Sequence, residues 1–525
     1  MKKQKNFLAL LCLMHLFGMA CTQKLTENTG ADRIQVSAQG TINPVFRRFE
    51  SNPVLRLQVN VPESGQSLQL GRVLGQIDAG KWQDISKLEF YLLKDGKEQL
   101  LGAVIPSGKN FTIPMQTALK PGKHELQLNV KLREDADMDG SFIFRVKSLY
   151  NSADQRFAVV QSELTSHPVG YTLRQHMDDG VQSYRIPGIT TTDKGTLISV
   201  YDIRYDNSKD LPANIDVGMS RSTDGGKTWS TMKAIIDMGG ANDNSGAGDP
   251  AVLFDPVTRT IWVAALWSKG NRSIAGSGPG LSPDETGQFV LTSSHDDGLT
   301  WSKPYSITSQ VKNPEWRLFF PGPGNGIAMA DGKIAFAAQY WDANKMPHST
   351  LVYSADHGKS WKSGIGAKSN TTESQLVEVA PGKLMLNMRD NRGKFRSVST
   401  TTDMGQSWTE HQTSYNALPD PVCMASLIKA RIHVQGKLRD VLFFSNANVS
   451  EGPRRNISIK ASLDNGESWQ STNSLLLDTR ECFGYSALSR IDDHTIGILY
   501  EGVKSLQFLR VPVNQIIKQF ESSTK

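Results

Sequence analysis

The sequence predicts an all-β protein in which a β-sandwich domain precedes a β-propeller. An eight-residue pattern, Ser/Thr-x-Asp-x-Gly-x-Thr/Ser-Trp, occurs five times after residue 220. Stretches that alternate apolar and polar residues fill the region before it, and only the short segment 513–520 has the pattern of an amphipathic helix. Repeats at a recurring spacing indicate a propeller or a related array.

The first twenty residues have the composition of a secretory signal. Lys2, Lys3 and Lys5 precede an apolar run, residues 7–17, and small residues end at Ala20. We therefore expect export to the periplasm, the cell surface or the medium. Removal of residues 1–20 lowers the formal net charge from +6 to +3. A chain so close to neutral gives no indication of a nucleic-acid partner.

Cys21 stands where a bacterial lipoprotein carries its lipid, and residues 21–35 read as a polar tether. Gly18 replaces the usual Leu three positions earlier, and plain cleavage after Ala20 explains the same residues, so both readings stay open. No later segment is apolar enough to span a bilayer, so a lipid on Cys21 is the membrane contact we expect. Cys423 and Cys482 are expected as buried thiols, although the sequence leaves their pairing open.

Residues 36–160 predict the sandwich through their period-two alternation. Apolar residues alternate with polar ones at 55–61, and the pattern recurs at 126–132 and 142–146. Turn signals at 94–96 and 120–122 separate these runs. Residues 161–178 are predicted to link this domain to the propeller.

The segment 135–140, Asp-Ala-Asp-Met-Asp-Gly, resembles the start of a calcium-binding loop. The twelfth position is Val146, where such a loop places a bidentate Glu. We therefore interpret it as a polar hairpin turn.

Residues 179–515 are predicted to form the propeller. The aspartates of the five repeats are separated by 72, 60, 47 and 61 residues and are Asp224, Asp296, Asp356, Asp403 and Asp464. In each copy the Asp can accept bonds from backbone amides, the Gly supplies a positive φ, and the Trp can pack between neighbouring sheets. A region of this length, at roughly 60 residues per repeat, predicts five to six blades.

Further motifs carry the chemistry. They are Tyr184-Arg185-Ile186-Pro187, Tyr201-Asp202-Ile203-Arg204 followed by Asp210, Thr372-Glu373-Ser374, Met388-Arg389-Asp390, Pro453-Arg454-Arg455 and Gly484-Tyr485-Ser486. With the repeats, which resemble Asp boxes, they make residues 180–513 similar to the bacterial exo-α-sialidases. The resemblance implies six blades and hydrolysis of terminal α-linked sialic acids on glycoproteins, glycolipids and oligosaccharides. It implies neither an organic cofactor nor a metal.

The resemblance also implies roles for these residues. Sialic acid carries a carboxylate on its anomeric carbon, and Arg185, Arg389 and Arg454 match the three arginines that bind it; Arg455 leaves the third assignment ambiguous by one position. A carboxylate nucleophile would be repelled by that anion, so the family uses a tyrosine, here Tyr485. Glu373 matches its base and Asp210 the acid/base, and two displacements imply retention of configuration.

Secondary candidates line the same pocket. Arg204 matches a family arginine near the acid/base, and Asp249 resembles a pocket aspartate. Residues 319–324 and 339–341 are candidates for the wall around the N-acetyl and glycerol groups.

Two other functions use the same scaffold. A glycan-binding propeller would keep the repeats without the chemistry, and an intramolecular trans-sialidase would keep the same catalytic residues. The sandwich is predicted to bind carbohydrate, and a rigid spacer is its alternative.

Overall fold

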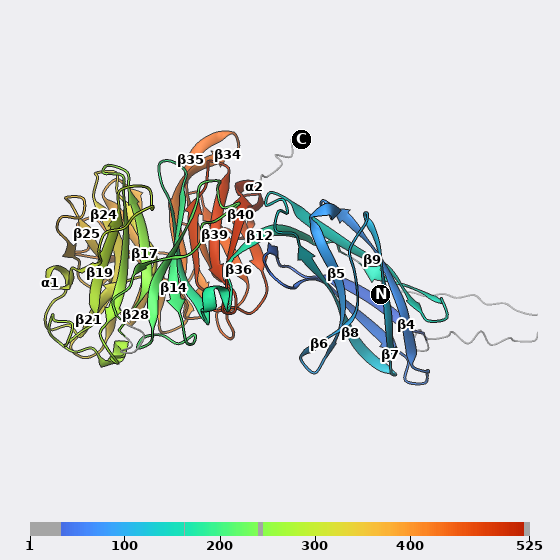
Figure 1. Cartoon of the computed structure of the whole chain (residues 1–525). Coiled ribbons are helices and arrows are strands. Elements are labelled where there is room, and N and C mark those ends of the chain that lie inside the picture. The colour runs from blue at the N-terminus through green and yellow to red at the C-terminus, as the bar shows by residue number, and fades with distance from the viewer. Residues whose placement is uncertain (1–32, 162, 240–244, 519–525) are drawn as a thin grey trace, which may run out of the picture.

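The computed structural model describes residues 33–161, 163–239 and 245–518, and within these ranges the chain is almost entirely β (Figure 1). The expected signal, residues 1–20, and Cys21 lie outside the described residues. The expected terminal helix is realised as one turn, α2 (Val513–Ile516), and the other α-helix, α1 (Thr308–Val311), is as short. Short 3-10 turns are η2 (Trp82–Asp84), η3 (Asp178–Gly180), η4 (Ile274–Gly276) and η5 (Ser471–Asn473). Among the described residues no helix has the length and apolarity that a bilayer crossing needs.

Two sheets of the N-terminal region enclose one hydrophobic core. Leu57 and Leu128 from one sheet meet Val73 and Phe144 from the other. The first sheet has the order β11 (Val160–Gln161), β1 (Gln35–Gly40), β3 (Asn52–Val61), β8 (Gly122–Leu132), β5 (Ile85–Lys94) and β6 (Lys97–Val104). The second contains β7 (Asn110–Leu119), β4 (Leu68–Ala79) and β9 (Ser141–Asn151), with β10 (Arg156–Ala158) beside β9. The predicted alternation is confirmed in β3, where the apolar side chains at 55, 57, 59 and 61 are buried and Arg56 and Gln58 are exposed.

The segment predicted as a linker contains a strand, β12 (Ser166–Arg174). Its first residues pair with β9, and Tyr171 to Arg174 pair with β40 (Leu506–Pro512). A short strand, β2 (Val45–Arg47), runs parallel to the middle of β12. The N-terminal sheet and the last sheet of the chain are therefore one continuous hydrogen-bonded ladder.

Residues 183–512 fold into six successive sheets, in each of which the main strands are antiparallel. The first holds β13 (Ser183–Thr191), β14 (Leu197–Arg204), β15 (Ile215–Ser222) and β16 (Lys233–Ile236). The second holds β17 (Gly246–Asp255), β18 (Thr260–Ser268), β19 (Gln288–Ser294) and β20 (Tyr305–Ser306), with β22 (Gly324–Asn325) at its edge. The third holds β21 (Leu318–Pro321), β24 (Ile334–Trp341), β25 (Pro347–Ser354) and β26 (Lys362–Ser363), with β23 (Ile327–Ala328) and β27 (Lys368–Ser369) beside them.

The last three sheets repeat this plan. The fourth holds β28 (Thr371–Ala380), β29 (Lys383–Asp390), β31 (Ser397–Thr401) and β32 (Thr409–Glu410), and a small ladder joins β30 (Lys394–Phe395) to β33 (Pro419–Asp420). The fifth holds β34 (Ser426–Val434), β35 (Lys437–Ala447), β36 (Ile457–Ser462) and β37 (Ser474–Asp478). The sixth holds β38 (Ser486–Arg490), β39 (Thr495–Glu501) and β40, and β12 supplies its outer strand.

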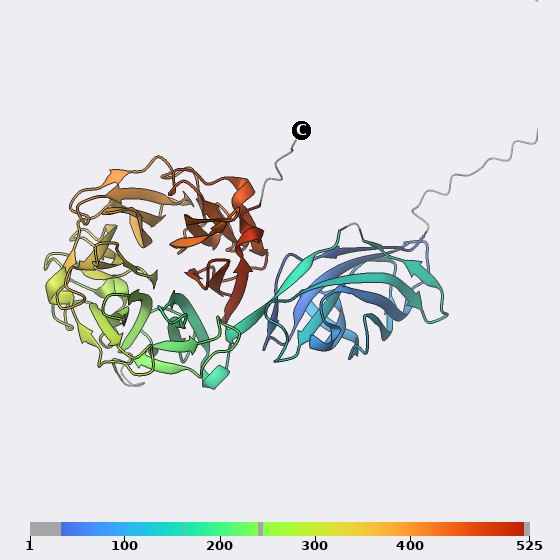
Figure 2. The same ribbon diagram turned by 90° about the horizontal axis from the view of Figure 1, so that it is seen from above.

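Each of these sheets packs on the next. Contacts run from β13 to β17, β17 to β24, β24 to β28, β28 to β34 and β34 to β38, and β38 also contacts β13. Seen from above in Figure 2, the sheets lie around a common axis, with the N-terminal sheets at the side. Because each sheet begins near this axis, the starts of the first strands and the ends of the second strands meet at one end of it.

The five repeats form the turns between the third and fourth strands of the first five sheets. In one of them Asp356 Oδ1 accepts bonds from the Ser354 hydroxyl at 2.7 Å and from the Ser360 amide at 2.9 Å. Equivalent bonds occur at the other four aspartates. Trp229 packs edge-on against Phe508 of the sixth sheet, and Trp361 against Trp262 of the second. The predicted packing of tryptophans between neighbouring sheets is confirmed for these two.

The segment 135–140 is a polar turn, as expected, but it joins β8 to β9 in different sheets and is not a hairpin. Asp139 binds Lys227 Nζ at 2.5 Å and Arg510 Nε at 2.8 Å. Lys227 belongs to the first repeat and Arg510 to β40. This acidic turn therefore attaches the N-terminal sheets to the first and sixth sheets.

We predict that the Asp356 carboxylate stabilises the fold only above strongly acidic pH. Its hydrogen bonds with Ser360 and Ser354 lower its pKa from 3.8 to about 2. A lowered folded-state pKa means that the stabilisation is present above about pH 4 and is lost as the pH falls towards 2. Asp356→Asn should cost about 1 kcal/mol at pH 7, allowing for solvent screening, and should flatten the dependence of Tm on pH below 4.

Thermal unfolding between pH 7 and pH 2 tests this expectation. Asp95→Asn, in an exposed turn of the N-terminal sheets, is the matched control and should behave as the parent does. Equal pH profiles for Asp356→Asn and the parent would contradict the assignment.

Candidate active site

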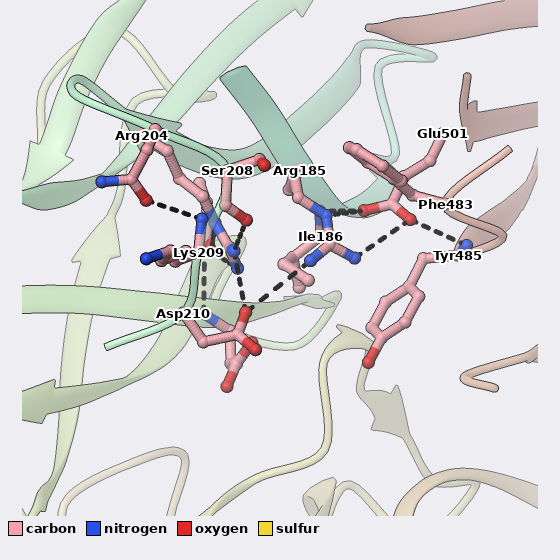
Figure 3. Close-up of polar contacts among 12 residues, drawn as sticks. Arg185, Ile186, Arg204, Ser208, Lys209, Asp210, Phe483, Tyr485 and Glu501 are labelled. Carbon is pink, nitrogen blue, oxygen red and sulfur yellow. Dashed lines mark hydrogen bonds and ion pairs between the residues drawn. The ribbon is translucent and has the colours of Figure 1, made fainter. Parts of the chain in front are cut away.

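The motif residues come from the first, fourth, fifth and sixth sheets and meet at one end of the common axis. Arg185 lies near the start of β13 and Glu373 near the start of β28. Arg389 lies near the end of β29, and Tyr485 directly precedes β38. Figure 3 shows Arg185 between Asp210 and Glu501, with the Tyr485 ring beside them. Residues up to 316 positions apart in the sequence thus share one site.

Tyr485 is the centre of this site. Its hydroxyl donates to Glu373 Oε1, and Arg389 Nη1 donates to the Tyr485 oxygen at 3.0 Å and to Glu373 Oε2 at 2.6 Å. The Tyr485 side chain is buried, and burial together with the negative charge of Glu373 holds its pKa well above the usual value. Tyr485 is therefore a neutral phenol whose proton already points at a carboxylate.

Three arginines surround the Tyr485 ring. The guanidinium carbon of Arg185 lies 5.4 Å from the ring centroid and that of Arg454 lies 5.8 Å from it, while Arg389 contacts the hydroxyl. Arg454 is held by the carbonyl oxygens of Phe483 and Val422, each at 2.9 Å. Its neighbour Arg455 is exposed. The geometry thus places Arg454, and not Arg455, beside Tyr485.

A buried carboxylate that the sequence analysis did not single out, Glu501, organises two of these residues. Its oxygens accept bonds from Arg185 Nε and from the backbone amides of Ile186 and Tyr485, each at 3.0 Å. Burial alone would lower the pKa of Arg185, but the charge of Glu501 raises it, so the guanidinium stays charged. An acidic residue at the end of the apolar strand 496–500 is the signal that could have indicated it.

Asp210 lies opposite Tyr485 on the loop between β14 and β15. Its side chain is 66% exposed and contacts Arg204 Nη1 at 2.7 Å and Arg185 Nη1 at 3.7 Å. Arg204 is only 2% exposed, and Asp202 holds it through Nε at 3.0 Å and Nη2 at 2.8 Å. Asp210 is thus a solvent-facing carboxylate that is held by the buried ion pair of Arg204 and Asp202.

Asp249 belongs to the same group of charges. Its amide donates to Asp202 Oδ1 at 2.9 Å, and its φ of 56° is in the left-handed region. Burial and the negative charges of Asp202, Asp210 and Glu373 raise the pKa of Asp249 well above the usual value. A raised pKa favours the protonated form of this carboxyl group, which can donate as well as accept a hydrogen bond.

Residues 319–324 and 339–341, the predicted pocket wall, contribute some side chains to the core and others to the surroundings of the site. Phe319 and Tyr340 lie in the core of the second and third sheets, where Tyr340 stacks on Trp316 with ring centroids 3.8 Å apart. Phe320 and Trp341 instead pack with Leu211, the residue after Asp210. The latter two are therefore the aromatic residues of these segments that support the Asp210 loop.

Cys423 and Cys482 are free thiols, and the expected burial is confirmed for Cys423, whereas Cys482 is only partly buried. Cys423 is buried with Ile186, Met424 and Tyr485, and burial raises its pKa to about 12.

Among the described residues, one group has the side chains to hold a metal ion: His433, Asp493 and His494. This group includes none of the residues around Tyr485.

Comparisons with known proteins agree with this arrangement. Residues 187–499 match the family model of the BNR repeat-like domain. A sialidase of Bacteroides fragilis strain YCH46 is 45% identical over 423 residues, which cover 78% of this chain and 77% of the relative. A sialidase of Micromonospora viridifaciens is 34% identical over 332 residues, 62% of this chain and 50% of that protein. The solved structure of the Hadza microbial sialidase Hz136 superposes with a TM-score of 0.84 at 36% identity, covering 92% of this chain and all of the other.

We predict that Glu501→Gln destabilises the protein by about 3 kcal/mol, because it leaves the buried guanidinium of Arg185 without its countercharge. Urea unfolding of the full chain measures this free energy. Glu481→Gln, an exposed residue nearby in the sequence, is the control and should change it by less than about 0.5 kcal/mol. A loss below about 1 kcal/mol for Glu501→Gln would contradict the role of the carboxylate as an electrostatic anchor.

Proposed function

This chain belongs to the sialidase family, and from its site we propose how it cleaves sialic acid from sialylated glycans. The protein is an exo-α-sialidase, a glycoside hydrolase. The observation that carries the proposed mechanism is the contact of the buried Tyr485 hydroxyl with Glu373 inside a set of three arginines.

We propose that the six sheets are the blades of a closed six-bladed propeller. Contacts between each sheet and the next, including those of β38 with β13, support closure. The outer strand β12, which comes from before the first sheet, pairs with β40 and would tie the last blade to the start of the ring. The repeats on the outer turns leave the axial end free for the site.

Arg185, Arg389 and Arg454 are proposed to bind the carboxylate of sialic acid. Guanidinium groups stay charged and can donate two parallel hydrogen bonds to a carboxylate. Arg185 is already fixed by Glu501 and Arg454 by two carbonyls, so little conformational entropy would be lost when the anion binds. Arg204 and Asp249 are proposed to bind polar substituents of the sugar.

Two displacements at the anomeric carbon would follow. In the first, the Tyr485 oxygen attacks this carbon, its proton passes to Glu373, and Asp210 protonates the departing glycosidic oxygen. In the second, Asp210 takes a proton from water, the water oxygen attacks the same carbon as the bond from this carbon to the Tyr485 oxygen breaks, and Tyr485 recovers its proton from Glu373. Each step inverts the centre, so the released sugar retains its configuration.

The neutral nucleophile follows from electrostatics. A second carboxylate a few ångströms from the carboxylate of the substrate would be repelled by it, and the repulsion grows where water is excluded. A buried phenol avoids this, and the arginines stabilise the negative charge that develops on its oxygen.

Hydrolysis is the outcome we propose, rather than intramolecular transfer. The intramolecular trans-sialidase from Ruminococcus gnavus has the same fold, with a TM-score of 0.57, but its sequence identity to this chain is only 18%. This likeness is one of fold alone and does not favour transfer over hydrolysis. Identification of the released sugar as free sialic acid or as a 2,7-anhydro sugar distinguishes the two reactions. Proton NMR of the first-formed anomer tests retention.

Other expectations complete the proposal. We propose that the protein is exported through residues 1–20, to the periplasm, cell surface or medium, with membrane contact confined to a lipid on Cys21. The N-terminal sheets are proposed to bind carbohydrate, and no nucleic-acid partner is proposed because the mature chain is nearly neutral.

Tyr485→Phe should lower kcat by at least about 1000-fold while leaving Tm within a few degrees, because the ring stays packed and only the nucleophilic oxygen is lost. Release of sialic acid from a fluorogenic α-sialoside measures this loss. Tyr305→Phe, a surface tyrosine, is the control. Substantial turnover by Tyr485→Phe would rule out the proposed nucleophile.

Asp210→Ala should discriminate between leaving groups. A phenolate leaves without protonation, so turnover of an aryl sialoside should fall by about tenfold, whereas turnover of sialyllactose should fall by about 1000-fold. Asp206→Asn, an exposed aspartate of the same loop, should affect neither substrate. Equal losses with both substrates would show that Asp210 does not protonate the leaving group.

A further inference from the structure

An aromatic side chain from the N-terminal region is inserted into the core between the fifth and sixth sheets. Phe46, on β2, is fully buried among residues of β34 to β40. Its ring lies edge-on to that of Tyr500 on β39, with centroids 6.3 Å apart. The guanidinium of Arg480 lies 5.4 Å from the centre of the Phe46 ring. The N-terminal region thus supplies part of the core behind the active site.

The backbone around Phe46 is held in place from the N-terminal side. Asn52, a fully buried residue of β3, accepts a bond from the Phe46 amide at 2.8 Å and donates to the Phe46 carbonyl at 3.2 Å. The same side chain donates to the carbonyl of Val130 on β8 at 3.1 Å. Gly170 of β12 pairs with Phe46, and a methyl group at Gly170 would lie 2.4 Å from its ring. The glycine therefore makes the space that the ring occupies.

From Phe46 a short series of contacts leads to the active site. The Tyr500 hydroxyl donates to Asp478 at 2.8 Å, and Asp478 also binds Arg480 at 2.6 Å. The Tyr500 side chain is therefore held through its hydroxyl as well as through the contact of its ring with Phe46. The next residue after Tyr500 is Glu501, whose side chain points to the opposite face of β39. Glu501 holds the guanidinium of Arg185 and the amide of Tyr485.

We propose that Phe46 is a positioning residue for the active site. By fixing Tyr500 it fixes the end of β39, and through Glu501 it sets the positions of Arg185 and Tyr485. This inference rests on the proposed roles of those two residues. The N-terminal region would then contribute to turnover as well as to any binding of glycans. A displacement of about 1 Å at a reacting group can cost about 100-fold in rate, so a loosened β39 is enough to matter.

Phe46→Ala and Phe443→Ala form the matched pair that tests this proposal. Phe443, on β35, is fully buried in the same core, but no aromatic contact joins it to Tyr500. Both changes leave a cavity and should lower Tm. Measured well below both Tm values, Phe46→Ala should lower kcat by roughly 10- to 100-fold and weaken the binding of sialic acid, whereas Phe443→Ala should change both by less than about twofold. Phe46→Leu should recover most of the loss.

A second pair moves the Phe46 ring without removing it, in case Phe46→Ala does not fold. Gly170→Ala should push the ring and reduce kcat, while Gly75→Ala, which meets Phe111 of the N-terminal core, should reduce only Tm. Equal kcat values within each pair would overturn the positioning role. Calorimetry measures the binding of sialic acid independently of turnover. A displaced Arg185 would therefore be detected as weaker binding even if the proposed catalytic mechanism were wrong.

Discussion

Burying the carboxylate of Glu501 costs free energy that only charged and well-aligned donors can offset. The structure provides them from two sheets: the Arg185 guanidinium and the Ile186 amide from the first, and the Tyr485 amide from the sixth. These bonds join the first and last of the six sheets at the point where the Tyr485 phenol lies. The same carboxylate therefore links the sheets and orients Arg185 and Tyr485, the groups proposed to act on the substrate.

The outer turns of the six sheets and the axial end that carries the site are held by different kinds of interaction. The outer turns use one local solution five times, in which an aspartate accepts bonds from residues two and four positions away. These aspartate bonds are made within each turn and need no distant partner, which suits a scaffold. The axial end is built from long-range contacts among charged residues, where exclusion of water strengthens each interaction. The outer turns thus rest on repeated local bonds, whereas the site is built from contacts that no single sheet could make.

The N-terminal region is integrated with the rest of the chain at several points. Strand β12 belongs to both parts, Asp139 binds Lys227 and Arg510, and Phe46 completes a core between the fifth and sixth sheets. A loosely tethered binding module would not need a buried aromatic anchor. Side-chain packing sets the position of the N-terminal region relative to the site. This fixed position constrains how the protein can approach a large glycan.

The all-β class, the repeat turns and the residue types of the site could be predicted, because each depends on patterns within a few residues: alternation for strands, Asp and Gly for turns, and short motifs around Arg185, Glu373 and Tyr485. Other features depended on the tertiary structure. Arg454 differs from Arg455 only in which side chain faces Tyr485, and Glu501 is an ordinary strand-end acid until Arg185, 316 residues away, contacts it. Local patterns were therefore enough to predict the strands and the turns, and the resemblance to a known family supplied most residue types of the site. Which of those groups meet, and that Glu501 joins them, follows from the folded structure, because hydrogen bonds and packing between sheets depend on distances in space that local sequence patterns do not encode.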